Sequence, residues 1–190
     1  MISFIAPLFN QAEFIRAWCE FTTANSDGVI ACDGDELMGD NKIKKVLIFD
    51  LNCLGDMLMS SPVMRALKEN GVEQVDVVVW RPCREVVECN SYIDNIYCSN
   101  VWWEAIKARF RGYDMVMQLN TSLKTNLLLW IAGKRRLGYS YGVKGLPLTM
   151  KVAIPYRTAT RGYRIRECLD LLEKGLGWEC KDERMIYEVK

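Results

Sequence analysis

Two periodicities of apolar residues alternate along most of this chain. Short, nearly continuous apolar runs, such as residues 46–49, are typical of strands that a parallel sheet buries on both faces. Between these runs, apolar residues recur every three or four positions, which predicts helices. The alternation predicts an α/β fold with a doubly wound, mostly parallel, Rossmann-like sheet. The expected strands are residues 46–49, 75–80, 95–98, 114–119, 136–139 and 151–154, and the expected helices include residues 82–89, 102–110 and 165–176.

The turn after the first expected strand carries the first candidate for chemistry. A helical pattern follows this turn, and Gly71 is placed to stop it. The helix is expected to begin either at Asp56, or at Ser61 with Pro62 in its first turn. In both cases Asp56 lies just beyond the carboxyl end of the strand, where open α/β sheets bind their ligands.

Structural explanations for this turn stand beside the functional one. Asp56 is a favoured N-cap residue, because its carboxylate accepts hydrogen bonds from free backbone N–H groups. Gly55 needs no more than a tight turn. A dinucleotide-binding fingerprint is not expected, since it requires three glycines and this turn has one glycine and a carboxylate that would repel phosphate.

The loop after the fourth expected strand is the second candidate. Thr121 or Ser122 is expected to cap a helix, and a helix N-terminus at this edge of a sheet suits an anionic group. Lys124 in the first turn opposes the helix dipole, which is more easily understood if it binds a ligand; the alternative is a solvent-exposed lysine. The helix ends at Gly133, and its expected apolar stripe is Leu123, Leu127, Trp130 and Ile131.

Aromatic and basic residues share the helix at residues 102–110. Trp102, Ile106 and Phe110 stand at helical spacing, and such stripes are expected to enter the core rather than to form a cofactor site. Trp102 and Trp103 could instead lie at a membrane interface, with rings at the depth of the lipid headgroups. Lys107, Arg109 and Arg111 would then contact phosphates. The alternative is an ordinary surface helix with one buried Trp.

Composition excludes several classes of protein. A chain of 190 residues, half of them apolar, can form one domain with a substantial core. No apolar run approaches the roughly 18 residues that span a bilayer, and the N-terminus lacks the basic region of a signal peptide. The eight cysteines form no C-x-x-C pair, so they are expected to be reduced thiols of a cytosolic protein. The absence of histidine excludes His-based catalysis and most zinc sites.

Charge is distributed unevenly along the chain, although the net charge is only +1. Residues 1–100 carry 8 Lys and Arg against 15 Asp and Glu, whereas residues 101–166 carry 13 against 2. A basic stretch of this size indicates an anionic partner, such as a phosphorylated glycolipid, an acidic membrane surface or nucleic acid. The alternative is a solvated face whose charges pair with acids elsewhere in the fold.

The order of motifs resembles one known family. Residues 44–71 (KKVLIFDLNCLGDMLMSSPVMRALKENG) and 113–140 (YDMVMQLNTSLKTNLLLWIAGKRRLGYS) resemble the N-terminal domain of glycosyltransferase family 9, the heptosyltransferases that build the inner core of bacterial lipopolysaccharide. The resemblance covers roughly residues 44–178, including NSYIDNIY, KRRLGY and RECLDLLEKGLGW. The chain departs from the family at Asp50, where many members have Arg, and near residues 161–163, where many have His.

The resemblance implies a GT-B enzyme of two Rossmann-like domains that face a cleft. In this family the N-terminal domain holds the acceptor, and the C-terminal domain holds a nucleotide sugar, typically ADP-heptose. Transfer inverts the anomeric centre and needs neither a metal nor another cofactor. By this resemblance Asp56 is the catalytic base, and Gly55, Asn120 and Lys124 contact the acceptor.

The family members are about twice as long as this chain, so the resemblance implies an acceptor-binding half whose donor domain is absent. The expected organisation is an extension at residues 1–41, an acceptor-binding domain at 42–180 and the start of a linker at 181–190. The implied partners are an anionic glycolipid and a separate donor domain, in the cytoplasm at the inner face of the membrane. Two alternatives are a non-catalytic half-enzyme that pairs with a donor domain, and a nucleic-acid-binding module; the latter is not expected, because no such motif is present.

Overall fold

A computed structural model describes residues 42–120, 122–140, 145–153 and 164–187 of the chain. Two units are distinguished, Met1–Gly39 and Asp40–Lys190, and all of the first lies outside the described residues. The separate role predicted for residues 1–41 therefore stays a prediction, and so does that of the linker at 181–190. The departure noted at residues 161–163 also lies outside the described part.

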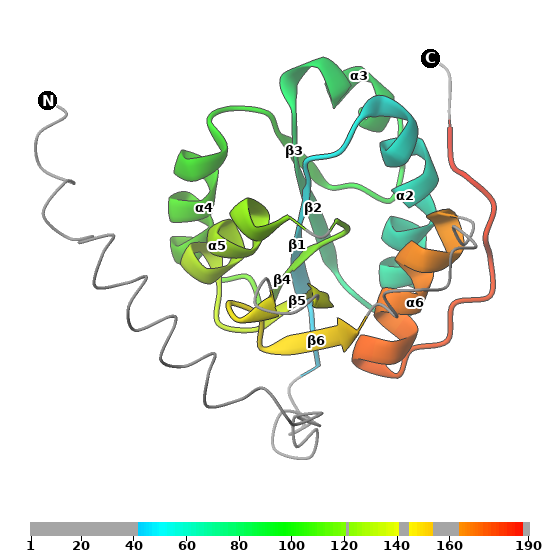
Figure 1. The fold of residues 1–190 in the computed structure, drawn as a ribbon. Coiled ribbons are helices and arrows are strands. Elements are labelled where there is room, and N and C mark those ends of the chain that lie inside the picture. The colour runs from blue at the N-terminus through cyan, green and yellow to red at the C-terminus, as the bar shows by residue number, and fades with distance from the viewer. Residues whose placement is uncertain (1–41, 121, 141–144, 154–163, 188–190) are drawn as a thin grey trace, which may run out of the picture. The chain divides into compact units, whose positions relative to one another are not determined.

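A six-stranded parallel sheet forms the centre of the second unit (Figure 1). The strand order is β3-β2-β1-β4-β5-β6, and each neighbouring pair is parallel. The predicted α/β fold with a doubly wound parallel sheet is confirmed. The strands are β1 (Lys45–Asp50), β2 (Gln74–Val79), β3 (Asn95–Tyr97), β4 (Met115–Gln118), β5 (Arg136–Ser140) and β6 (Met150–Ala153).

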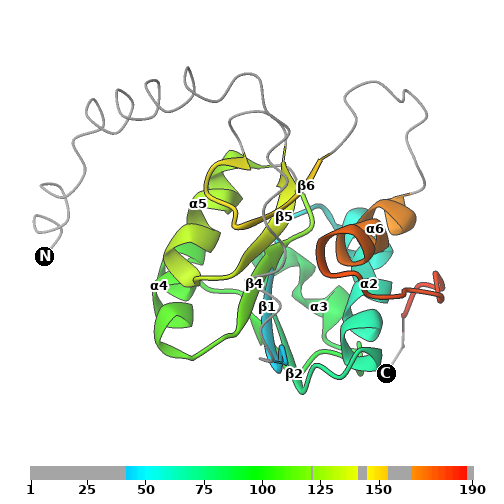
Figure 2. The same cartoon turned by 90° about the horizontal axis from the view of Figure 1, so that it is seen from below.

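Helices cover both faces of the sheet (Figure 2). One face carries α2 (Leu54–Glu69), the short η2 (Arg81–Cys83), α3 (Arg84–Val87) and α6 (Arg164–Leu176). The other face carries α4 (Val101–Phe110) and α5 (Leu123–Ala132), which pack against each other. No helix in the described part of the chain is long and apolar enough to cross a bilayer.

Strand β1 shows why its sequence is an unbroken apolar run. Val46 and Ile48 point toward α2 and α6, and Leu47 and Phe49 point toward α4 and α5. All four side chains are completely buried, because helices cover both sides of this central strand. The prediction of a strand buried on both faces is confirmed.

Helix α2 begins earlier than either start predicted from the sequence. Its first residue is Leu54, and Pro62 lies in its interior rather than in its first turn. Proline lacks the N–H that would bond to the carbonyl of Leu58. The hydroxyl of Ser61 donates to that carbonyl at 2.7 Å instead, so the helix continues with the carbonyl satisfied.

The core-facing sides of α4 and α5 differ from the predicted stripes. In α4 the small residues Ala105 and Ala108 pack on the sheet, while Phe110 is 84% exposed and neither Trp102 nor Trp103 is buried. In α5 the buried apolar residues are Leu128, Leu129 and Ala132, and Trp130 is half exposed. The prediction of the buried face was wrong because small residues let two helices lie close together on the sheet, and bulky rings on that side would separate them.

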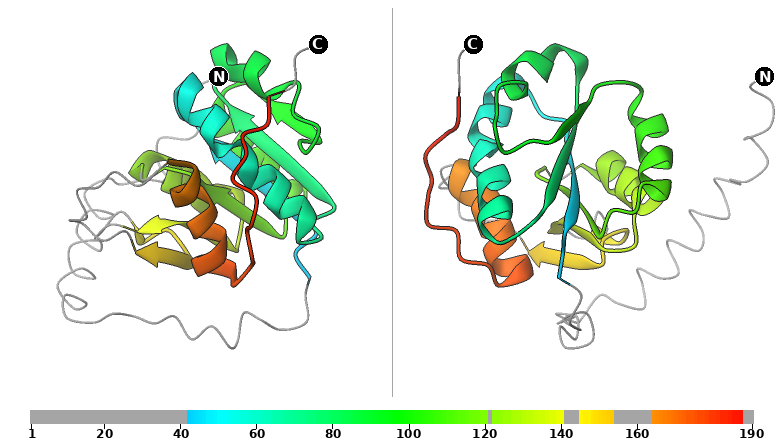
Figure 3. Two further views of the ribbon diagram at one scale, coloured as in Figure 1. Left: turned by 90° about the vertical axis from the view of Figure 1, so that its right-hand side faces the viewer. Right: turned by 180° about the vertical axis from the view of Figure 1, so that it is seen from behind.

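Residues 181–187 run in extended conformation along α2 (Figure 3). Arg65 of α2 donates to the backbone carbonyls of Asp182 and Arg184, at 2.7 and 3.0 Å. The Ser61 hydroxyl accepts a hydrogen bond from the backbone N–H of Ile186 at 2.8 Å. Two side chains of one helix therefore hold this segment against the domain.

Candidate functional site

The order of strands defines a crevice at one edge of the sheet. The chain progresses from β1 through β2 to β3 in one direction, and β4, β5 and β6 continue on the other side of β1. The connections after β1 and β4 therefore leave toward opposite faces, into α2 and α5. Open α/β sheets bind ligands at such a switch point, outside the carboxyl ends of the two strands, and we call this edge of the sheet the crevice.

Asp50, the last residue of β1, is completely buried and organises the turn into α2. Its carboxylate accepts hydrogen bonds from Asn52 Nδ2 at 2.7 Å and from Ser60 Oγ at 2.5 Å. Burial raises the pKa of Asp50, and the hydrogen bonds from Ser60 and Asn52 and the charge of Arg164 offset only part of this rise. Asp50 stands where, by the family resemblance, many members have Arg. In this chain the residue is a buried acid that fixes the conformation of the loop.

Asp56 lies in the first turn of α2, partly exposed at the crevice. The N-cap residue is Cys53, which makes no side-chain capping bond, so the expectation that Asp56 caps the helix was wrong. Its carboxylate still lies near the positive end of the helix dipole. A partly exposed carboxylate that is not used for capping remains available to a ligand.

Gly55 lies inside the helix rather than in a tight turn, so the structural reason expected for this glycine was also wrong. A Cβ atom added at Gly55 would meet nothing within 4 Å. The missing side chain therefore leaves open space beside Asp56.

Arg164 reaches the same edge from the start of α6, and it was not among the residues predicted for the site. Its guanidinium donates to the backbone carbonyl of Leu119 and to Glu167 Oε2, the latter at 3.2 Å. Burial lowers the pKa of Arg164, but nearby groups, among them Cys168, Glu167 and Asp56, outweigh that effect and raise it. The only signal in the sequence was a basic residue in the first turn of a helix, where it opposes the dipole as Lys124 does.

The loop from β4 to α5 flanks the crevice from the other side. Ser122 caps α5, accepting the N–H of Thr125 at 3.5 Å, which confirms one of the two predicted caps; Thr121 lies outside the described residues. The side-chain oxygen of Asn120 accepts the N–H of Ser122 at 3.2 Å. Asn120 therefore shapes the loop through its side-chain oxygen.

Lys124 is exposed and lies over an aromatic ring. Its Nζ is 5.9 Å from the ring centre of Trp80, which follows β2. The indole of Trp80 donates to the carbonyl of Leu51, just after β1, at 3.0 Å. These contacts connect the ends of β2, β1 and α5, and they hold a cation beside the crevice.

The edge thus combines one partly exposed carboxylate with the cations Lys124 and Arg164 and the N-terminal ends of α2 and α5. Such an arrangement can attract an anionic ligand and accept a proton from one of its hydroxyl groups. No group of three or more His, Cys, Asp or Glu side chains in the described part is arranged to hold a metal ion.

No protein-family model matches the chain, and neither does any curated protein. Solved structures do match. The chain is similar to E. coli heptosyltransferase WaaC with ADP-2-deoxy-2-fluoro heptose, at 17% identity and a TM-score of 0.61, over 72% of this chain and 50% of that one. A glycosyltransferase of family 9 from Veillonella parvula DSM 2008 gives 19% identity and a TM-score of 0.66, over 77% and 45%.

A third structure, E. coli ADP-heptose lps heptosyltransferase II, gives 17% identity and a TM-score of 0.62, over 77% of this chain and 47% of that one. The resemblance to glycosyltransferase family 9 is confirmed at the level of the fold, a glycosyltransferase-like Rossmann domain. The chain spans about half the length of each structure that it matches.

Proposed function

We propose that this chain is the acceptor-binding half of an inverting glycosyltransferase that transfers a sugar from a nucleotide sugar to a glycolipid core. The observation that carries the proposal is the position of Asp56. It lies at the switch point of a fold shared with half of each heptosyltransferase, partly exposed and not used as a helix cap. Lys124 and Arg164 add positive charge at the same edge.

The proposed reaction follows from these groups. Asp56 accepts the proton of an acceptor hydroxyl while that oxygen attacks the anomeric carbon of the donor sugar. The bond from that carbon to the nucleoside diphosphate breaks, and the configuration inverts. An exposed carboxylate is a weak base, so most of the rate comes from orientation and from stabilisation of the leaving diphosphate. The groups that stabilise the diphosphate belong to a second domain.

The donor is proposed to be ADP-heptose, because one matching structure is of WaaC with ADP-2-deoxy-2-fluoro heptose and another is of an ADP-heptose lps heptosyltransferase. The acceptor is proposed to be an anionic glycolipid of the lipopolysaccharide inner-core type, which fits the cations beside Asp56. The reaction would take place in the cytoplasm, at the inner face of the membrane, with a donor domain as partner. Without that domain, the chain should bind acceptor weakly and transfer little.

Acceptor binding tests the role of Lys124. We expect Lys124→Gln to weaken binding of a phosphorylated inner-core oligosaccharide about ten-fold, because one charge-assisted contact is lost. The matched control is Lys174→Gln on α6, where Lys174 pairs with Asp170 at 2.7 Å. NMR titration of both variants gives the affinities, and equal effects of the two substitutions would contradict a site at Lys124.

Transfer tests the role of Asp56. With a family 9 donor domain fused after Lys190, Asp56→Asn should reduce transfer from ADP-heptose by about 10²- to 10⁴-fold and leave acceptor affinity nearly unchanged. Mass spectrometry of the oligosaccharide measures the product. If the variant transfers the sugar as fast as the parent, Asp56 is not the catalytic base.

Donor binding distinguishes an acceptor half from a complete enzyme. Calorimetry with ADP-heptose and the unfused chain should show no heat while circular dichroism shows an intact fold. Saturable binding would mean that these 190 residues hold a nucleotide site of their own.

A further inference from the structure

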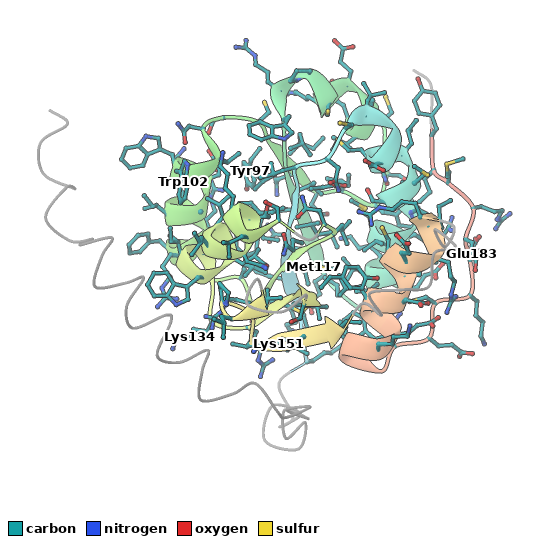
Figure 4. All side chains as sticks on the ribbon, in the orientation of Figure 1. Tyr97, Trp102, Met117, Lys134, Lys151 and Glu183 are labelled. Atoms are coloured by element: carbon teal, nitrogen blue, oxygen red, sulfur yellow. The ribbon has the colours of Figure 1, made fainter. Side chains whose placement is uncertain are left out.

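The outer surface of α4 and α5 exposes several large apolar side chains. Phe110, Trp103, Trp130, Trp102 and Ile106 are between 84% and 37% exposed, and we call them the aromatic face. Figure 4 shows Trp102 directed away from the ribbon. Clustered rings on a surface cost solvation free energy unless something covers them, so such a patch marks an interaction site.

Cations that have no acidic partner in the described part of the chain lie beside the aromatic face. A hollow of about 410 Å³ is lined by Arg109, Trp130, Ile131, Lys134 and Arg136. Burial and the charge of Arg109 lower the pKa of Arg136. Within the described residues, neither Arg109 nor Lys134 forms an ion pair with an acidic side chain. Like charges that converge on an open hollow favour the binding of an anion there.

Two of the basic residues that the sequence proposed for phosphate contacts are paired with an acid in the structure. Lys107 and Arg111 pair with the buried carboxylate of Glu104, at 3.1 and 3.0 Å. The cations available to a ligand are therefore Arg109 and Lys134, at the ends of α4 and α5 nearer the amino edge of the sheet. The hollow next to them, of about 630 Å³, adds Lys42; it is also lined by Asp114 and by Lys44, which pairs with Glu73 at 2.9 Å.

We propose that the aromatic face, with Arg109 and Lys134, docks on an anionic lipid bilayer. Rings that enter the interface while adjacent cations contact headgroup phosphates are the usual means of peripheral binding. The charge of the region agrees, since residues 101–140 carry 7 Lys and Arg against 2 Asp and Glu. A second copy of the chain fits less well, because a symmetric dimer through this face would bring the same cations together.

The proposal goes beyond the glycosyl transfer proposed above and does not depend on Asp56. It also explains how the crevice with Asp56 would come close to a glycolipid substrate. Helix α4 follows β3 and therefore starts at the carboxyl edge of the sheet, the edge of the crevice. A domain that lies on the bilayer along α4 and α5 keeps the crevice near the membrane, so a glycolipid can reach it without leaving the bilayer.

Vesicle flotation of the full chain tests the charge contribution. The parent should bind vesicles that contain phosphatidylglycerol, bind pure phosphatidylcholine vesicles far less, and release in salt. The double variant Arg109→Gln and Lys134→Gln should bind about 30-fold more weakly, since each cation near an anionic surface contributes roughly five-fold. The control, Lys174→Gln with Lys181→Gln, removes the same charge elsewhere and should bind nearly as the parent does.

The aromatic contribution has its own pair of variants. Trp103→Ser with Phe110→Ser should weaken binding at least ten-fold, because exposed rings supply apolar contact and their removal scarcely affects folding. Met185→Ser with Tyr187→Ser, on the exposed segment along α2, is the control and should leave binding unchanged.

Three outcomes would overturn the proposal. In the first, neither the charge variant nor the aromatic variant binds vesicles more weakly than its own control. The second is self-association that the aromatic variant abolishes, which would assign the face to a second copy. The third is a full chain that binds no anionic vesicles.

Discussion

At the scale of single residues, Asp50 shows how burial changes the role of a side chain. In the sequence it is only the acid after an apolar run, at a position where the family resemblance implies Arg. In the structure it is buried at the end of β1 and holds Asn52 and Ser60 in place. The sequence made Asp56, Asn120 and Lys124 candidates by their places after strands, but it could not point to Arg164, because only tertiary contacts bring α6 to that edge.

Asp50→Asn should change how stability depends on pH. Burial raises the pKa of Asp50 in the folded state. An acid with a raised folded pKa costs stability above its unfolded pKa, and that cost grows as the pH rises toward the folded value. The amide variant carries no such cost, so its stability relative to the parent should increase as the pH rises from the unfolded pKa of an aspartate toward the raised folded pKa.

Urea unfolding at several pH values measures the difference. The control is Glu179→Gln, because Glu179 forms an exposed pair with Lys181 that contributes little to stability. A constant difference between the Asp50 variant and the parent at all pH values would contradict the predicted cost of ionising Asp50.

At the scale of elements, the C-terminal ends of helices were easier to predict than the start of α2 or the buried faces of α4 and α5. Gly71 was predicted to stop α2, and it does so with a φ of +86°, a conformation that favours glycine. The N–H of Gly71 bonds to the carbonyl of Lys68 and that of Val72 to the carbonyl of Leu67, which is a Schellman motif. The buried faces of α4 and α5 were predicted wrongly, because apolar residues surround both helices and periodicity alone does not select one side.

Alanine at Gly55, inside α2, and at Gly71, just after its C-terminal end, should have opposite effects. Gly71→Ala should lower the free energy of unfolding by about 1 kcal/mol, since a side chain is strained at positive φ. Gly55→Ala should raise it by up to about 1 kcal/mol, because alanine favours the helix and a Cβ there meets nothing within 4 Å. Urea denaturation of both variants measures this, and effects of the same sign would contradict the assigned conformations.

At the scale of the whole molecule, contacts far apart in the sequence complete the domain. The segment at residues 181–187 lies against α2 through Arg65 and Ser61, more than a hundred positions away. Arg65 also forms an ion pair with Asp182 at 3.1 Å and is itself nearly buried. No local pattern predicts these contacts.

Arg65→Ala should release this segment. We expect the free energy of unfolding to fall by about 2 kcal/mol, because hydrogen bonds from a charged, nearly buried group are lost. Trypsin should then cleave after Lys181 and Arg184 faster than in the parent. Arg65→Lys keeps the charge without the planar guanidinium and should fall between the two. Equal cleavage rates for all three proteins would show that Arg65 does not hold the segment.

The sequence by itself determined the parallel α/β fold, most strand positions, and the two loops with Asp56 and Lys124. It could do so because strand burial and helix termini are set by residues close together in the chain. Only the tertiary structure decided which faces of α4 and α5 are covered, which cations are paired, and that Arg164 joins the crevice. These properties depend on packing between segments that are distant in the sequence. Such segments come into contact only when the sheet and its two helical layers assemble.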